Sequence, residues 1–124
     1  MILSEIVEAL SCDVFTGKDR LNNKIEYGCA SDLMSDVLAF SRAGSLLLTG
    51  LVNLQTVQTA YIAEIKAIVF VRGKKPDGTI IDLAKEKKIP LLGTNYSMYE
   101  ACGLLYQKGL VSTIACVPCT AVHG

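Results

Sequence analysis

The sequence lacks a net charge and any long hydrophobic run. Twelve Lys and Arg residues balance twelve Asp and Glu residues, which excludes the basic surface typical of nucleic-acid-binding proteins. No apolar run approaches the roughly 18 residues of a membrane span, and the first residues, MILSEIVEALS, contain two glutamates where a signal peptide would be basic. We therefore predict a cytoplasmic protein that binds neither nucleic acid nor a membrane.

Histidine is almost absent, because His123 is the only one. A Ser-His-Asp or Cys-His nucleophile would have to recruit it from the last two residues of the chain, where side chains are rarely held in place. The sequence also contains neither the P-loop pattern G-x-x-x-x-G-K-[ST] nor the dinucleotide pattern G-x-G-x-x-G. We therefore predict no catalytic residues and a protein that is not an enzyme.

Hydrophobic residues make up 51% of the 124-residue chain, which is enough to bury a core without a metal or disulfides. We predict one domain over residues 1–124, ending in a short flexible tail, residues 111–124. The five cysteines are an odd number, and a reducing cytoplasm keeps thiols free. Cys12, Cys29 and Cys102 have apolar neighbours and are expected in the core.

A single C-x-x-C motif, Cys116 and Cys119, lies in this tail. A thioredoxin-like role is disfavoured, because only five residues follow the motif and no helix begins there to lower a thiol pKa. Two interpretations stay open. The two thiols are either oxidisable without an assigned task, or they form a metal site that His123 and Cys102, or the same pair on a second subunit, would complete.

Apolar runs and helical patterns alternate through the middle of the chain. Three short runs without polar alternation are typical of strands covered on both faces: SLLLTG, AIVFV and PLLG. The helical patterns are LQTVQTAYIAEI after the capping residue Asn53, PDGTIIDLAKEKK with Pro76 in its first turn, and SMYEACGLLYQKG with a Ser97–Glu100 capping box and Gly109 at its end. This order predicts an α/β fold of three layers, with a mainly parallel sheet flanked by helices.

The first 44 residues are less regular. Residues 2–10 have the spacing of an amphipathic helix, and CDVF and KIEYGCA predict two short strands around the polar loop TGKDRLNN. LMSDVLAFS predicts a helix that Ser31 or Asp32 caps and Gly44 follows, with Leu33, Val37 and Phe40 on one face.

Three loops follow the predicted parallel strands, at the edge of the sheet where ligands usually bind in such folds. Glycines there allow close backbone approach, polar side chains bind phosphate or ribose, and cations neutralise an anion. The candidate ligand-binding residues are Thr49, Gly50, Asn53, Arg72, Gly73, Lys74, Thr94 and Asn95. Turn-forming glycines and helix caps explain the same loops equally well, so both interpretations stay open.

The ordered segments GCASDLMSDVLAF, GSLLLTGLVN and AIVFVRGKKPDGTIIDLAKEKKIPLLGTNYSMYEACGLL resemble the DRTGG domain over roughly residues 2–109. The resemblance implies a fold similar to the N-terminal domains of HPr serine kinase/phosphorylase and of the MurE and MurF ligases. It implies no kinase activity, because that chemistry belongs to a separate P-loop domain. Two short motifs typical of the family differ in this sequence. Leu51-Val52 stands where the family tends to have Asp-Arg, and Val71-Arg72-Gly73 stands where it has Thr-Gly-Gly.

The resemblance further implies a non-catalytic regulatory or protein-interaction domain that senses a nucleotide or another anionic small molecule. We expect a homodimer and a protein partner such as an enzyme or a hydrogenase component, since stand-alone members are often encoded near iron-only hydrogenase components. The alternative is a metal or redox accessory protein that uses Cys116 and Cys119. No cofactor is expected beyond a nucleotide or phosphate at the strand ends, or a metal at this pair.

Overall fold

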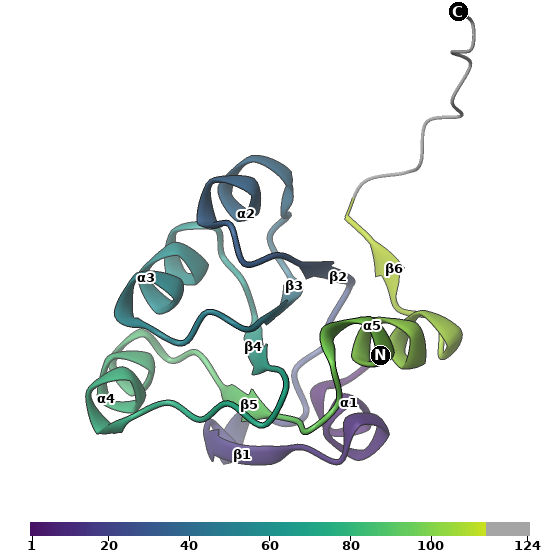
Figure 1. The fold of residues 1–124 in the computed structure, drawn as a ribbon, viewed down its shortest axis with the longest axis horizontal. Coiled ribbons are helices and arrows are strands. Elements are labelled where there is room, and N and C mark those ends of the chain that lie inside the picture. The colour runs from purple at the N-terminus through teal and green to yellow at the C-terminus, as the bar shows by residue number, and fades with distance from the viewer. Residues whose placement is uncertain (114–124) are drawn as a thin grey trace, which may run out of the picture.

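The computed structural model describes residues 1–113, which form one six-stranded sheet between two layers of helices (Figure 1). The strand order is β1-β5-β4-β3-β2-β6. β1 pairs antiparallel with β5, and the other four pairs are parallel. The strands are β1 (Asp13–Thr16), β2 (Tyr27–Ala30), β3 (Ser45–Thr49), β4 (Ala67–Phe70), β5 (Leu91–Gly93) and β6 (Val111–Ser112). The predicted α/β class and mainly parallel sheet are confirmed.

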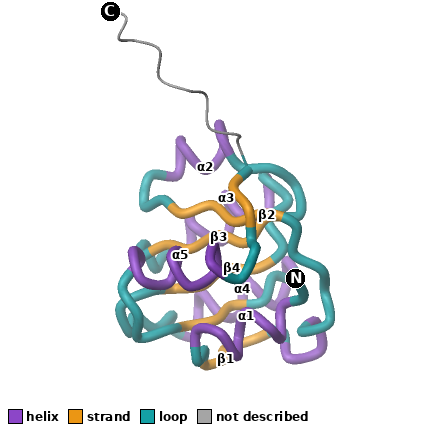
Figure 2. Tube along the Cα trace, turned by 90° about the vertical axis from the view of Figure 1, so that its right-hand side faces the viewer, coloured by secondary structure: helices purple, strands orange, loops and turns teal. Residues whose placement is uncertain are grey.

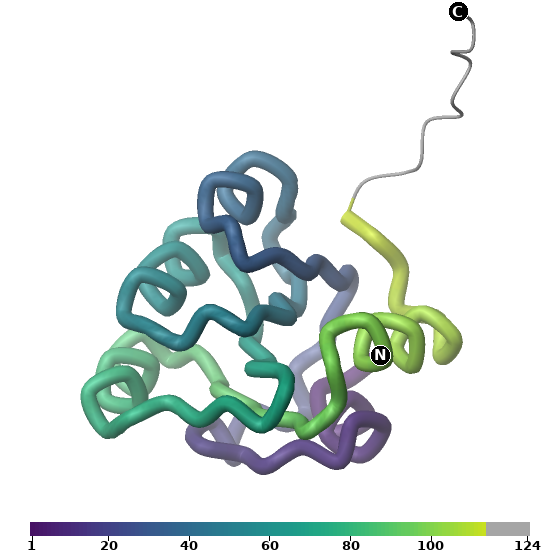
Figure 3. The backbone as a smooth tube through the Cα atoms, viewed as in Figure 1, coloured from purple at the N-terminus to yellow at the C-terminus, as the bar shows by residue number. Residues whose placement is uncertain are grey.

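Five helices cover the sheet. α1 (Leu3–Leu10) and α5 (Met98–Gln107) pack side by side on one face, although they come from opposite ends of the described chain (Figures 1 and 3). α2 (Met34–Phe40), α3 (Leu54–Ile62) and α4 (Gly78–Lys87) cover the other face. Figure 2 looks from the side of α1 and α5, so the strands run across the view behind these helices. A short 3₁₀ turn, Lys18–Arg20, follows β1. No helix within residues 1–113 is long and apolar enough to cross a membrane.

The central strands are mostly apolar because both of their faces are covered, and the polar residues of β3, Ser45 and Thr49, are buried at its two ends. Leu46 and Leu48 contribute to the cluster under α1 and α5, whereas Leu47 between them packs into the cluster under α2, α3 and α4. Ile68 and Phe70 of β4 also face this second cluster. Successive side chains of a strand point to opposite faces, so a strand with helices on both sides needs hydrophobic residues without interruption.

Two of the four predicted helix signals in the second half of the chain, the Asn53 cap and the left-handed Gly109, are confirmed. The Ser97–Glu100 capping box is present only in part: Ser97 caps the helix, but within residues 1–113 the Glu100 side chain makes no bond back to the Ser97 N–H. Asn53 Oδ1 accepts from the Thr56 N–H at 2.9 Å, Ser97 Oγ accepts from the Glu100 N–H at 3.2 Å, and Gly109 has a left-handed φ of 103°. Pro76 does not lie in the first turn of α4. Asp77 is the N-cap instead, because its carboxylate accepts from the Ile80 N–H at 3.0 Å.

The prediction for α2 was wrong in its cap and partly wrong in its buried face. Leu33, and neither Ser31 nor Asp32, occupies the N-cap position. Leu33 and Phe40 are 58% and 54% exposed, while Val37 is buried. Asp32 is unavailable as a cap because its carboxylate binds the loop after β3.

The predicted flexible tail, residues 111–124, begins inside the sheet. Val111 and Ser112 form β6, which lies parallel to Tyr27 and Gly28 at the edge of the sheet. Residues 114–124, with Cys116, Cys119 and His123, lie outside the described residues.

Candidate ligand-binding site

The three predicted loops meet at the carboxyl edge of the sheet, because β3, β4 and β5 are neighbours there. The Arg72 N–H donates to the Tyr96 carbonyl oxygen at 2.9 Å, and the Gly73 N–H donates to that of Thr94, also at 2.9 Å. Lys74 crosses to the other side, where its Nζ donates to the Gly50 carbonyl oxygen at 2.9 Å. The loop after β4 therefore ties the loops after β3 and β5 together.

A tight turn at Arg72 and Gly73 sets the position of the arginine. Both residues have left-handed backbones, with φ of 61° and 70°. For a residue with a side chain this conformation costs roughly 1 kcal/mol or more, so the two hydrogen bonds to the β5–α5 loop are needed to hold it. The turn places the guanidinium against Gly50, where a Cβ would lie only 2.2 Å from Arg72 Nη2. Glycine at position 50 thus leaves room for the arginine head group.

Asp32 is a site residue that the sequence interpretation missed. It follows β2, the next strand of the sheet, and its Oδ1 accepts from the Gly50 N–H at 2.6 Å and from the Thr49 hydroxyl at 2.9 Å. The bond from the Gly50 N–H has the largest effect and lowers the pKa of the carboxyl. Burial opposes it, and the Thr49 hydroxyl and the charges of Arg72 and Lys74 lower the pKa further. The sequence feature that could have indicated Asp32 is its position just after a strand of the parallel sheet.

Three of the predicted polar side chains already make hydrogen bonds within the protein. The Thr49 hydroxyl, which donates to Asp32, also accepts from the Leu51 N–H at 3.1 Å. Asn53 Oδ1 accepts from both the N–H and the hydroxyl of Thr56. The buried Thr94 hydroxyl donates to the Leu10 carbonyl oxygen at 2.7 Å and so anchors the loop after β5 to α1. These three side chains order the site rather than present free groups.

Exposed groups remain on the same loops. The side chains of Arg72, Lys74 and Asn95 are exposed, and those of Arg72 and Asn95 make no hydrogen bond within residues 1–113. Lys74 uses one of its three donors on Gly50, and Lys75 beside it is exposed too. The arrangement can therefore offer several N–H donors and positive charge to an anion.

The model of the DRTGG domain matches residues 5–107, which is most of the chain. The chain belongs to the DRTGG domain family. No curated protein matches the sequence.

A solved structure shares the fold of this DRTGG domain. It is the crystal structure of the CBS and DRTGG domains of the regulatory region of Clostridium perfringens pyrophosphatase, complexed with its activator, diadenosine tetraphosphate. The TM-score is 0.73 at 18% sequence identity, and the match covers 93% of this chain but 50% of the other. This likeness shows a common fold, and the chain spans half the length of that neighbour.

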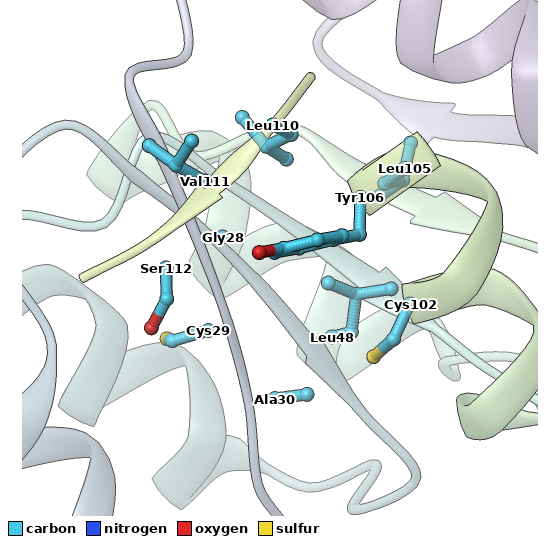
Figure 4. Close-up of a pocket in the computed structure, with 10 residues that line it drawn as sticks. All are labelled: Gly28, Cys29, Ala30, Leu48, Cys102, Leu105, Tyr106, Leu110, Val111 and Ser112. Atoms are coloured by element: carbon cyan, nitrogen blue, oxygen red, sulfur yellow. The ribbon is translucent and has the colours of Figure 1, made fainter. Parts of the chain in front are cut away.

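An apolar pocket lies apart from the charged loops of the domain. Its volume is about 110 Å³, and it lies between α5 and the β2–β6 edge of the sheet (Figure 4). The lining includes Leu48, Leu105, Tyr106 and the two cysteines Cys29 and Cys102, and it contains no charged side chain. This pocket therefore lacks the charged groups that an anionic ligand requires. The exposed loops after β3, β4 and β5 supply such groups.

The three described cysteines are partly buried thiols. Burial raises the pKa of Cys12 to about 12, with a smaller effect of Asp13, and raises that of Cys29 to about 11, with a smaller effect of Cys102. Burial also raises the pKa of Cys102. Within residues 1–113 no three His, Cys, Asp or Glu residues are grouped as metal ligands. The proposed metal residues Cys116 and Cys119 lie outside this range, so that site stays a prediction.

Alkylation of the native domain by iodoacetamide at pH 8 is expected to be much slower at Cys12 and Cys29 than in the urea-unfolded chain. Relative to the ordinary value of 9.0, the raised pKa lowers the thiolate population about 1,000-fold for Cys12 and about 100-fold for Cys29. Peptide mass spectrometry at timed intervals measures each rate. Equal rates in the native and unfolded chains would show that these thiols are not buried.

Proposed function

We propose that this DRTGG domain is a non-catalytic regulatory domain that binds a nucleotide or a similar phosphorylated molecule at the carboxyl edge of its sheet. The observation that carries the proposal is the exposed cationic turn Arg72–Lys74, which is hydrogen-bonded to the loops on both sides. The regulatory region of similar fold, which was crystallised with a nucleotide activator, supports a regulatory role for the domain.

The chemistry of the turn suits phosphate. An arginine guanidinium has five donors in a planar fork that matches two phosphate oxygens, and a lysine ammonium adds a compact charge. Arg72, Lys74 and Lys75 fall within four residues of the loop after β4, so their charges act on the same ligand group. Gly73 is exposed beside them, so its backbone leaves room for a ligand to approach closely.

The described residues also support a role without catalysis. Residues 1–113 contain no histidine, and the raised pKa values of Cys12, Cys29 and Cys102 keep these thiols protonated near neutral pH. Asp32 stays ionised and is bound to the β3–α3 loop. Within residues 1–113, this edge of the sheet therefore has no histidine or reactive thiolate to act as a general base.

A protein partner is part of the proposal, because a regulatory domain acts through another domain or chain. The outer face of α5 offers a contact surface, since Tyr99 is 88% exposed and Tyr106 71%. Exposed aromatic residues of this kind are enriched at protein interfaces. The expected homodimer remains a prediction, and we propose the outer face of α5 as its interface.

A thermal-melt screen with ATP, GTP, UTP and inorganic phosphate tests the proposed site. A ligand that binds only the native state raises the melting temperature by mass action, here by several degrees at saturation. The double variant Arg72→Ala and Lys74→Ala should lose at least about tenfold in affinity, because two charge-assisted contacts are removed. Both side chains are exposed, so the unliganded variant should melt within a few degrees of the wild type.

The matched control removes two exposed lysines elsewhere. Lys66 precedes β4 and lies at the opposite end of this strand from Arg72, and Lys85 lies in the last turn of α4. Changing both to alanine removes the same net charge without touching the loops, so the nucleotide shift should persist. A nucleotide that shifts the Arg72/Lys74 variant as much as the wild type would place the binding site elsewhere.

A further inference from the structure

Asp32 introduces a negative charge into a site that is otherwise suited to an anion. Its Oδ1 is bound to the Gly50 N–H and the Thr49 hydroxyl. No nitrogen of Arg72 or Lys74 lies within 4.0 Å of the carboxylate in the described part of the chain, so the charge is not neutralised by direct contact.

The second carboxylate oxygen is free to bind a ligand. Oδ2 accepts no hydrogen bond within residues 1–113, and the side chain is exposed. The two bonds to Oδ1, from the Gly50 N–H and the Thr49 side-chain hydroxyl, hold the carboxylate against the buried end of β3. The lowered pKa keeps the carboxyl ionised at neutral pH, and an ionised carboxylate only accepts hydrogen bonds. Oδ2 therefore repels phosphate and attracts a hydroxyl group.

The carboxylate and the cations lie in a row across three adjacent strand ends. Asp32 follows β2, Gly50 follows β3, and Arg72 and Lys74 follow β4. Gly50 contacts both ends of the row, since its N–H donates to Asp32 and its carbonyl accepts from Lys74. Gly50 thus lies between the acceptor and the cation, so a ligand that spans this residue contacts both, as a sugar and its phosphate would.

We propose that Asp32 is the specificity-determining residue of this site: it accepts a hydrogen bond from a sugar hydroxyl, so the site prefers ribonucleotides to deoxyribonucleotides and to phosphate chains without a sugar. The inference rests on the proposed function. Carboxylates at the end of a strand recognise ribose hydroxyls in other α/β folds by the same chemistry.

Isothermal titration of the full chain with ATP, 2′-deoxy-ATP, 3′-deoxy-ATP and tripolyphosphate tests the proposal, with the guanine series used instead when GTP gives the larger melting shift. The wild type should bind at least one deoxy analogue about tenfold or more weakly than the ribonucleotide, because a charged acceptor loses its donor. Asp32→Asn keeps an oxygen for Gly50 and Thr49 but removes the charge. This variant should lose most of the preference for ribose and bind tripolyphosphate several-fold more tightly.

Asp36→Asn is the matched control, because Asp36 is an exposed carboxylate one turn further along, on α2, and it makes no hydrogen bond through its side chain in residues 1–113. The ligand preferences of the Asp36→Asn variant should equal those of the wild type.

Equal binding of the ribonucleotide and its deoxy analogues by the wild type, with Arg72 and Lys74 still required, would overturn the role of Asp32 and leave the proposed function intact. Equal weakening of every ligand by Asp32→Asn would reduce Asp32 to a residue that holds the loop. Absence of nucleotide binding to the wild type would overturn the proposed function itself.

Discussion

Replacing Phe70 by alanine is expected to lower the free energy of unfolding by about 3–5 kcal/mol. Phe70 is the last residue of the central strand β4, is 0% exposed, and fills the core between the sheet and α2, α3 and α4. Truncation leaves a cavity that the surrounding rigid strands fill only partly. Urea unfolding followed by circular dichroism measures the change.

Phe40→Ala is the control for this variant. Phe40 has the same side chain but is 54% exposed at the end of α2, so its loss should change stability by no more than about 0.5 kcal/mol. Phe70→Leu, a milder change, keeps the experiment informative when the alanine variant does not fold. A cost below about 1 kcal/mol for Phe70→Ala would contradict the packing described here.

Gly17→Ala is expected to lower stability by about 2–4 kcal/mol, from a strained backbone and a steric clash together. Gly17 follows β1 with a φ of 95°, a conformation that residues with a side chain rarely adopt. A Cβ there would lie 2.6 Å from Pro90 Cβ and 2.7 Å from Pro90 Cα. Because Pro90 immediately precedes β5, relief of the clash would push β1 away from β5, the strand it pairs with in the described residues. Denaturant unfolding again gives the change in stability.

Gly103→Ala separates this effect from a general cost of replacing glycine. Gly103 lies in the interior of α5, and a Cβ there would meet no atom within 4 Å. Alanine is the better helix residue, so this variant should gain up to about 1 kcal/mol. Opposite signs for the two substitutions are the expected result. A stabilising Gly17→Ala would show that the turn after β1 is not held against Pro90.

Local patterns predicted most of the elements correctly because their causes lie within a few residues. The runs around Leu47 and Val69 are apolar throughout since both of their faces are covered, and Asn53 and Ser97 cap helices by bonding an N–H three residues ahead. The errors occurred where a distant segment competes for a local group. Asp32 has the spacing of a helix cap, but the N–H of Gly50 and the hydroxyl of Thr49 take its carboxylate.

In the candidate site, too, features that depend on neighbouring residues were predicted and contacts with distant segments were not. Loops after consecutive parallel strands were sufficient to predict that the segments containing Gly50, Arg72 and Asn95 meet at one edge of the sheet, while anion binding there stays a prediction. The sequence could not indicate that the hydroxyls of Thr49 and Thr94 would be used inside the protein. Thr94 binds the carbonyl of Leu10, 84 residues away in the sequence, and only the packing of α1 against the sheet brings them together.

The sequence by itself determined the α/β class, the apolar strands and most of the helix boundaries, because periodicity, capping and turn formation depend on neighbouring residues. The resemblance of its ordered segments indicated the family. Only the tertiary structure decided the strand order β1-β5-β4-β3-β2-β6, the left-handed turn at Arg72, and the meeting of Asp32, Gly50 and Lys74. These features depend on which strands become neighbours in the sheet. That choice balances long-range burial against chain entropy, and no short stretch of the sequence contains it.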